Sequence, residues 1–161
     1  TMSTKAVNYA QSLLTRLWDR EIPIAPDKII NKIDDVELIY KSMPDNISGK
    51  LNYDLTKKKY IITINSNHHP NRQRFTIAHE LGHYMLNHGN KEDTLYRDTN
   101  GMYEPDEIEA NEFAAELLMP SGALRHLIFE QGIVNVTTLA QSFWVSEQAM
   151  LFRLKKLGFI S

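Results

Sequence analysis

The amino-acid sequence predicts an α+β fold in which a small three-stranded antiparallel sheet packs on a mainly helical domain. Three observations support this class. Runs rich in Val, Ile, Leu and Tyr are confined to residues 36–65, while apolar residues recur at helical spacing both before and after them. The 161 residues, 42% of them hydrophobic, fit one globular domain with a substantial core.

Two helices are expected ahead of the sheet. The first covers residues 5–19, where these apolar residues recur at helical spacing: Ala6, Tyr9, Ala10, Leu13, Leu14, Leu17 and Trp18. Two prolines then interrupt the chain. A short second helix is predicted after Asp27, because Ile29, Ile30 and Ile33 follow at helical spacing.

Three strands are predicted near residues 36–42, 47–53 and 59–65, with the last two forming a hairpin. The third strand is the most strongly marked, because β-branched and aromatic residues fill most of it. It leads almost directly into the next helix. Its edge could receive an extended peptide, and a closed sheet edge is an equal alternative.

The following helix, residues 74–86, contains the most informative motif of the chain. Residues 79–83 read His-Glu-Leu-Gly-His. On a helix His79 and His83 stand one turn apart on one face, so both imidazoles can bind a single metal ion. Glu80 is rotated away from that pair and is placed to act as general base on a metal-bound water.

The surroundings of this motif support a buried metal site. Apolar residues flank it on almost every side: Phe75, Ile77, Ala78, Leu81, Met85 and Leu86. Three ionisable groups in such a helix are costly unless they are paired or bind a metal. Gly82 costs about 1 kcal/mol relative to alanine, which indicates close approach by another element. The alternative is a pair of hydrogen-bonded core histidines with Glu80 on the helix surface.

A second helix, residues 107–119, is expected to supply the third ligand. Its alanines would let it approach Gly82 closely. Glu109 shares a face with Phe113 and Leu117 and so points toward the apolar side, where a carboxylate needs a metal or a partner. We therefore predict Glu109 as the third ligand. With the two histidines it would form a His2Glu set that leaves one position open for water.

Other side chains compete for this role. Glu112 and Glu116 are four residues apart and indicate a solvated face, whereas Glu107 lies in the first turn, where a carboxylate interacts favourably with the helix dipole. His88 is one residue out of place for a zincin pattern with a third histidine. It lies in residues 87–106, a polar stretch predicted to be a loop of about twenty residues, which is long for a compact domain.

Composition restricts the metal and the compartment. The chain has no cysteine, so histidine and carboxylate are the strong ligands left, and zinc is expected, with Mn²⁺ or Fe²⁺ fitting the same ligand types. A net charge of −2 gives no global attraction to nucleic acid or to an anionic membrane. Without a signal-peptide-like or membrane-spanning stretch, a cytoplasmic protein is expected.

The C-terminal residues 134–161 are predicted to form a helical subdomain that resembles a helix-turn-helix, with residues 1–133 forming the main domain. Phe143 lies on its first helix, Trp144 occupies the turn where glycine is common, and Ser146 caps the second helix. The basic residues of that second helix come late, whereas side chains that read bases usually lie near its start. DNA binding is therefore not expected, and partner docking or plain packing is favoured.

With both helices identified, the chain resembles the ImmA/IrrE family of metallopeptidases. The resemblance rests on residues 74–83, Arg-Phe-Thr-Ile-Ala-His-Glu-Leu-Gly-His, and on residues 109–120, Glu-Ala-Asn-Glu-Phe-Ala-Ala-Glu-Leu-Leu-Met-Pro. Residues 145–154 give weaker support, and the similarity covers roughly residues 36–160. The resemblance implies a zincin-like domain around the His-Glu motif.

The resemblance also implies an activity. Such proteins are bacterial zinc endopeptidases, often carried by phages or mobile elements, that cut a helix-turn-helix transcriptional repressor. Carried over by position, the matching residues are His79, His83 and Glu109 as metal ligands and Glu80 as general base. The alternative is a non-proteolytic metal-containing protein that docks on a repressor or belongs to a toxin–antitoxin system.

Overall fold

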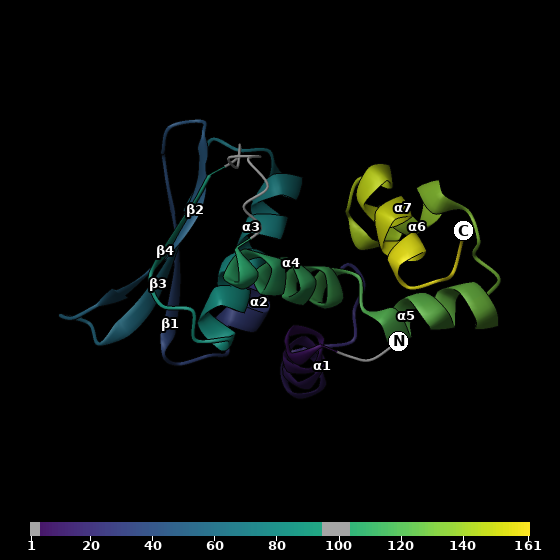
Figure 1. Ribbon diagram of the computed structural model, residues 1–161, viewed down its shortest axis with the longest axis horizontal. Coiled ribbons are helices and arrows are strands. Elements are labelled where there is room, and N and C mark those ends of the chain that lie inside the picture. The colour runs from purple at the N-terminus through teal and green to yellow at the C-terminus, as the bar shows by residue number, and fades with distance from the viewer. Residues whose placement is uncertain (1–3, 95–103) are drawn as a thin grey trace.

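The computed structural model describes residues 4–94 and 104–161, and they form the expected α+β fold (Figure 1). The sheet in this part of the chain has four strands: β1 Val36–Lys41, β2 Ile47–Asp54, β3 Lys59–Asn65 and β4 Lys91–Thr94. Their order is β1-β3-β2-β4, with β1 parallel to β3 and β2 antiparallel to both β3 and β4. The sheet stands at one end of the molecule, and the C-terminal helices lie at the other.

The prediction of three antiparallel strands is wrong in two respects. First, β1 is parallel to β3. Residues 42–46 reverse the chain, but β2 does not pair with β1; a space for one strand is left between them, and β3 fills it. Buried Asn65 fixes this connection, since its Nδ2 donates to the main-chain oxygens of Met43, Pro44 and Ile47 at 3.2, 3.0 and 2.8 Å.

Second, β4 lies within the stretch predicted as a loop. It is only four residues long and polar, so no alternation of apolar residues marks it in the sequence. It forms by pairing with β2, which is distant in sequence, and the ladder is irregular between Ile47 and Gly49. Tertiary pairing therefore decides the conformation of this segment.

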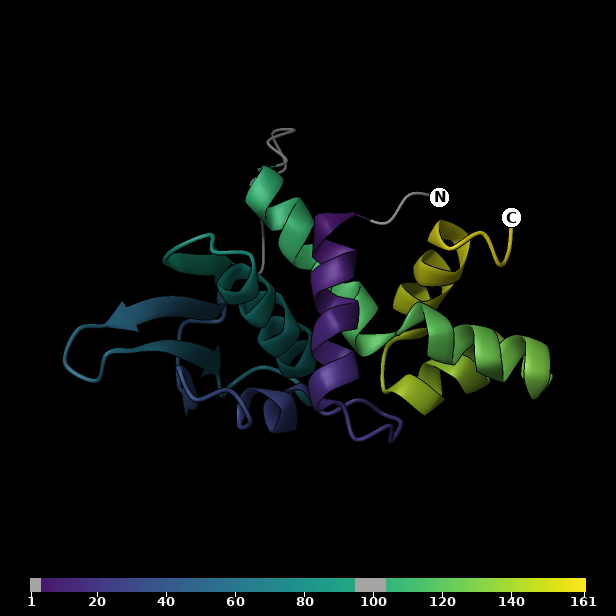
Figure 2. The same ribbon diagram turned by 90° about the horizontal axis from the view of Figure 1, so that it is seen from below.

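The helix with the His-Glu motif, α3 Pro70–Met85, packs on β2 and β3, and α4 Pro105–Leu118 lies beside it. Gly82 permits this approach, because a Cβ atom at Gly82 would lie only 3.1 Å from Cβ of Phe113 on α4. The expectation that another element approaches Gly82 is confirmed. The two N-terminal helices, α1 Lys5–Leu17 and α2 Pro26–Ile30, are also present, and α1 packs on α4 (Figure 2).

The C-terminal part contains α5 Ser121–Arg125, a π-helical turn at His126–Glu130, α6 Val136–Phe143 and α7 Glu147–Lys156. Trp144 between α6 and α7 has φ 54° and ψ 48°, the left-handed conformation that glycine adopts readily. A DNA-binding role for this helix pair and a boundary after residue 133 stay predictions. No helix in the described parts of the chain is long and apolar enough to cross a membrane.

A buried ion pair joins α7 to α4. Arg153 donates from Nη2 to Glu116 Oε1 at 2.6 Å and from Nε to the main-chain oxygen of Met119 at 3.1 Å. Glu116 Oε2 in turn accepts hydrogen bonds from the backbone nitrogen and Oγ of Ser121. Glu116 is thus buried, not on a solvated face as predicted, and the charge of Arg153 is already neutralised inside the protein.

We expect Arg153→Met to lower the free energy of unfolding by about 3–5 kcal/mol, because it leaves the Glu116 carboxylate buried without its charged partner. Urea denaturation measures this loss. Lys155→Met, an exposed position two residues away, is the matched control and should change stability by less than about 0.5 kcal/mol. Equal effects of the two substitutions would contradict a stabilising role for the pair.

Candidate metal centre

Helix α3 places both motif histidines in the interior with their Nε2 atoms converging. His79 is 2% exposed and His83 is fully buried, and their Nε2 atoms lie 3.1 Å apart. The i,i+4 spacing on one helix produces this arrangement, as predicted. Glu80 is on the same helix and is also fully buried, but its carboxylate is not among the donor atoms that converge with the histidines.

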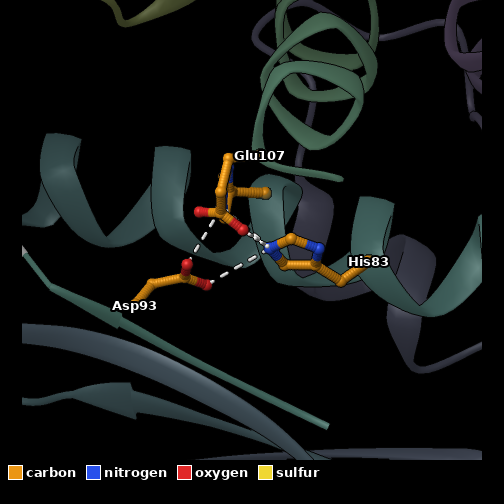
Figure 3. Close-up of side chains that lie close together, drawn as sticks. His83, Asp93 and Glu107 are labelled. Atoms are coloured by element: carbon orange, nitrogen blue, oxygen red, sulfur yellow. Dashed lines mark hydrogen bonds and ion pairs between the residues drawn. The ribbon is translucent and has the colours of Figure 1, made fainter. Parts of the chain in front are cut away.

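Two carboxylates meet the histidine pair from other elements. Glu107, in the first turn of α4, has Oε1 3.2 Å from His79 Nε2 and Oε2 2.8 Å from His83 Nε2. Asp93, on β4, approaches from the sheet side, with Oδ1 3.4 Å from His79 Nε2 and Oδ2 3.5 Å from His83 Nε2. Figure 3 shows both carboxylates facing the same ring nitrogen of His83. One donor atom from each of the four residues lies within 4.8 Å of all the others.

The structure does not bring Glu109, the carboxylate chosen from the sequence, to this cluster, and Glu107 lies beside the two histidines in its place. Glu109 Oε1 lies 2.9 Å from His88 Nε2 instead. The two glutamates are two residues apart and therefore point to nearly opposite sides of α4. Glu107 shares a face with Asn111, and Asn111 Oδ1 lies 2.8 Å from Nδ1 of His79 on α3. The sequence signal that could have identified Glu107 was Asn111, a hydrogen-bonding amide four residues later on the same side of the helix.

Asp93 was missed because the sequence carries no local signal for it. It is one of several acidic residues in a polar stretch. Only the pairing of β4 with β2, in which Asp93 is opposite Gly49, turns its side chain toward α3. A ligand candidate supplied by a short edge strand depends on tertiary structure that periodicity does not reveal.

Each histidine is also held through its second ring nitrogen. His79 Nδ1 lies 2.8 Å from Asn111 Oδ1, and His83 Nδ1 lies 2.8 Å from Nδ1 of His88. Such outer contacts fix the ring orientation and the position of the ring proton, and they are typical of metal-binding histidines. The alternative of two core histidines that bond only to protein accounts less well for a pair of Nε2 atoms facing two carboxylates.

The electrostatics of the cluster favour a cation. Burial by itself raises the pKa of Asp93, but hydrogen bonds from His79 and His83 outweigh it and hold that pKa far below its usual range. Burial also raises the pKa of Glu107, and hydrogen bonds from His79 and His83 again outweigh it, so this pKa is lowered. Burial lowers the pKa of both histidines, while their hydrogen bonds to Asp93 and Glu107 raise it above its ordinary value. Both carboxylates are therefore ionised, and two nitrogen and two carboxylate donors in one buried site suit a divalent metal.

Comparison with known proteins identifies the family. The model of the IrrE N-terminal-like domain matches residues 32–155, which include all four converging residues. The chain belongs to the ImmA/IrrE family of metallopeptidases. The family name implies a divalent metal, and the cluster on α3, α4 and β4 provides donors that can hold one.

Three relatives match this chain over different fractions of their own length. The radiation response metalloprotease IrrE of Deinococcus deserti is 36% identical over 103 residues, which are 59% of this chain and 36% of that protein. The metallopeptidase ImmA of Bacillus subtilis is 29% identical over 135 residues, 82% of this chain and 78% of ImmA. The immunity region protein 2 of Bacillus phage phi105 is 36% identical over 87 residues, 53% of this chain and 52% of that protein.

A solved structure extends the family likeness to the fold. The Mycobacterium tuberculosis transcriptional regulator matches with a TM-score of 0.60 over 92% of this chain and 46% of that chain. At 18% sequence identity this match shows a shared fold alone. The chain thus spans about a third of the IrrE protein and less than half of the regulator.

Proposed function

We propose that this protein is a zinc-dependent endopeptidase that hydrolyses a peptide bond in a helix-turn-helix transcriptional repressor. The observation that carries the proposal is the convergence of both α3 histidines with Glu107, next to a buried glutamate that stays outside the donor set. Membership of a metallopeptidase family supports the same chemistry.

Three residues are assigned as metal ligands in this proposal: His79, His83 and Glu107. Asp93 is the fourth candidate, but both of its oxygens lie farther from the histidines, at 3.4 and 3.5 Å against 3.2 and 2.8 Å for Glu107. A hydrolytic zinc site keeps one position for water, whereas four protein ligands are typical of a structural site. We therefore assign Asp93 as a neighbour of the reacting water and of Glu80.

In the proposed reaction Glu80 moves the protons. When bound, zinc would polarise the substrate carbonyl and lower the pKa of water at the site. Glu80 takes a proton from the attacking water and returns it to the leaving amine. Its complete burial keeps bulk water away from this carboxylate, and the ionised Asp93 beside it favours uptake of the proton by Glu80.

The substrate class is suggested by the relatives. One is named metallopeptidase ImmA, and another is named an immunity region protein of a phage. We extend from these names to a repressor of the helix-turn-helix type, encoded near the gene for this protein on a prophage or mobile element. Such a substrate requires the two proteins to meet in the cytoplasm.

The zinc-loaded protein incubated with that neighbouring repressor should produce a single new pair of fragments, which intact-mass analysis detects and assigns to one bond. Chelation of the metal should prevent the cleavage. Intact repressor after prolonged incubation, with zinc bound throughout, would contradict the proposal.

A docking protein with a structural metal is the second candidate, and one observation favours it. Asp93 adds a fourth protein donor to the cluster, as closed structural sites have. The incubation described above separates the two functions, because a docking protein forms a stable complex with the repressor and leaves the polypeptide uncut.

A further inference from the structure

A second group of titratable side chains lies directly behind the metal centre. His88, Asp106 and Glu109 have donor atoms within 4.8 Å of one another, and none of them is among the three ligands assigned in the proposed function. His88 follows the end of α3, where Asn87 and Gly89 on either side of it both have positive φ, 59° and 82°. The backbone nitrogen of His88 donates to the main-chain oxygen of His83 at 3.0 Å. This tight turn presents the His88 ring to the ring of His83.

The ring contacts form a chain that leads away from the metal centre. His83 Nδ1 lies 2.8 Å from His88 Nδ1, and His88 Nε2 lies 2.9 Å from Glu109 Oε1. The His88 side chain is 5% exposed, so water does not compete strongly for either nitrogen. Glu109 is 34% exposed, so the chain ends at the surface of α4.

Hydrogen-bond chemistry allows one arrangement of protons along this chain once the metal is bound. A neutral imidazole that gives its Nε2 lone pair to a metal carries its proton on Nδ1. His83 Nδ1–H must therefore donate to His88 Nδ1, which accepts. His88 then carries its own proton on Nε2 and donates it to Glu109, which as a carboxylate can only accept.

We propose that His88 and Glu109 are positioning residues that hold His83 in the tautomer and orientation needed to bind the metal. The proposal rests on the metal site of the proposed function, but it does not depend on the substrate or on peptide cleavage. Asn111 holds His79 in the same way, because its Oδ1 accepts from Nδ1–H of His79. Glu109, predicted from the sequence to bind the metal directly, thus acts on it through two imidazole rings.

A second metal ion at His88, Asp106 and Glu109 is the alternative use of this cluster, and the contacts argue against it. Asp106 Oδ1 is 3.6 Å from His88 Nε2, and its other oxygen already pairs with Lys91 Nζ at 3.0 Å. The Lys91 hydrogen bond also lowers the pKa of Asp106. Lys91 therefore supplies the positive charge that this carboxylate needs.

Zinc affinity, measured by competition with a chromophoric chelator, tests the proposal without reading peptidase activity. His88→Ala and Glu109→Ala should each weaken zinc binding by about 10- to 100-fold, the range for outer partners of metal ligands. Glu109→Gln should recover most of the loss, because its amide oxygen still accepts from His88 Nε2–H. Glu112→Ala, on the same helix and outside both clusters, is the matched control and should bind zinc like the native protein.

Ring protonation gives a second, spectroscopic readout. Long-range ¹H–¹⁵N spectra of the zinc-loaded protein should show the proton on Nδ1 of His83 and on Nε2 of His88. The opposite tautomer of His88, or unchanged zinc affinity in both alanine variants, would overturn the proposal. A bound zinc stoichiometry of two would also overturn it in favour of a second metal.

The metal-free variants separate positioning from folding. Thermal unfolding of metal-free His88→Ala and Glu109→Ala should resemble that of the metal-free native protein, while their zinc affinities fall. If the metal-free variants were destabilised enough to explain the whole fall in zinc affinity, the positioning role would be overturned. A protein that binds zinc through this chain and yet cuts no repressor would refute the proposed function and leave the present inference standing.

Discussion

Replacing Glu80 by glutamine should lower the rate of repressor cleavage by about 10²- to 10⁴-fold, the usual contribution of a general acid–base residue. The amide has nearly the shape of the carboxylate but cannot accept a proton from water. Because Glu80 lies outside the group of converging donors, the variant should still bind one zinc ion per chain. Cleavage rates from fragment intensities and the zinc content of the purified variant measure the two effects separately.

The matched control for this substitution is Glu92→Gln. Glu92 is exposed on β4, one residue from Asp93, so its replacement makes the same chemical change without touching α3. We expect native cleavage rates in this control. Full activity of Glu80→Gln would refute the assigned base, and loss of zinc together with activity would make Glu80 a ligand or a structural residue instead.

Removal of the Glu107 carboxylate should have the second large effect. Glu107→Ala should weaken zinc binding by more than the roughly 100-fold at the upper end for outer partners, because Glu107 reaches both histidine Nε2 atoms directly. Cleavage should be lost with the metal. Chelator competition measures the affinity, and excess zinc should restore part of the activity if the fold is intact.

Asp93→Ala is the informative comparison for Glu107→Ala. Because we assign Asp93 next to the reacting water and not to the metal, its loss should weaken zinc binding far less than the loss of Glu107. Cleavage by this variant should nevertheless fall, since Asp93 contacts Glu80. Equal losses of zinc affinity in the two variants would make Asp93 a fourth ligand and favour the docking protein with a structural metal.

The sequence predicts those parts of the centre that depend on local geometry. Two histidines four residues apart share a helix face whatever surrounds the helix, and Gly82 marks the side where α4 approaches. The choice between Glu107 and Glu109 does not depend on local geometry alone, because α4 packs on both α1 and α3. Apolar spacing then no longer identifies the face next to α3.

The remaining differences come from contacts between segments that are distant in sequence. Asp93 reaches the centre only because four polar residues pair with the edge of β2. The parallel pairing of β1 with β3 follows from where residues 42–46 return the chain, and Asn65 stabilises that return from the far end of β3. Neither the propensity nor the periodicity of the segments involved encodes these neighbours.

The ion pair between Arg153 and Glu116 connects the C-terminal helices to the metal centre without adding a donor to it. All four converging residues come from one stretch of the chain, from His79 to Glu107, and the helices after α5 contribute none of them. Yet α7 is joined to α4, the helix that carries Glu107 in its first turn, through the buried ion pair of Arg153 with Glu116. Substitutions on the outer surface of the C-terminal helices therefore leave all four converging donors in place, provided that Arg153 and Glu116 are kept together.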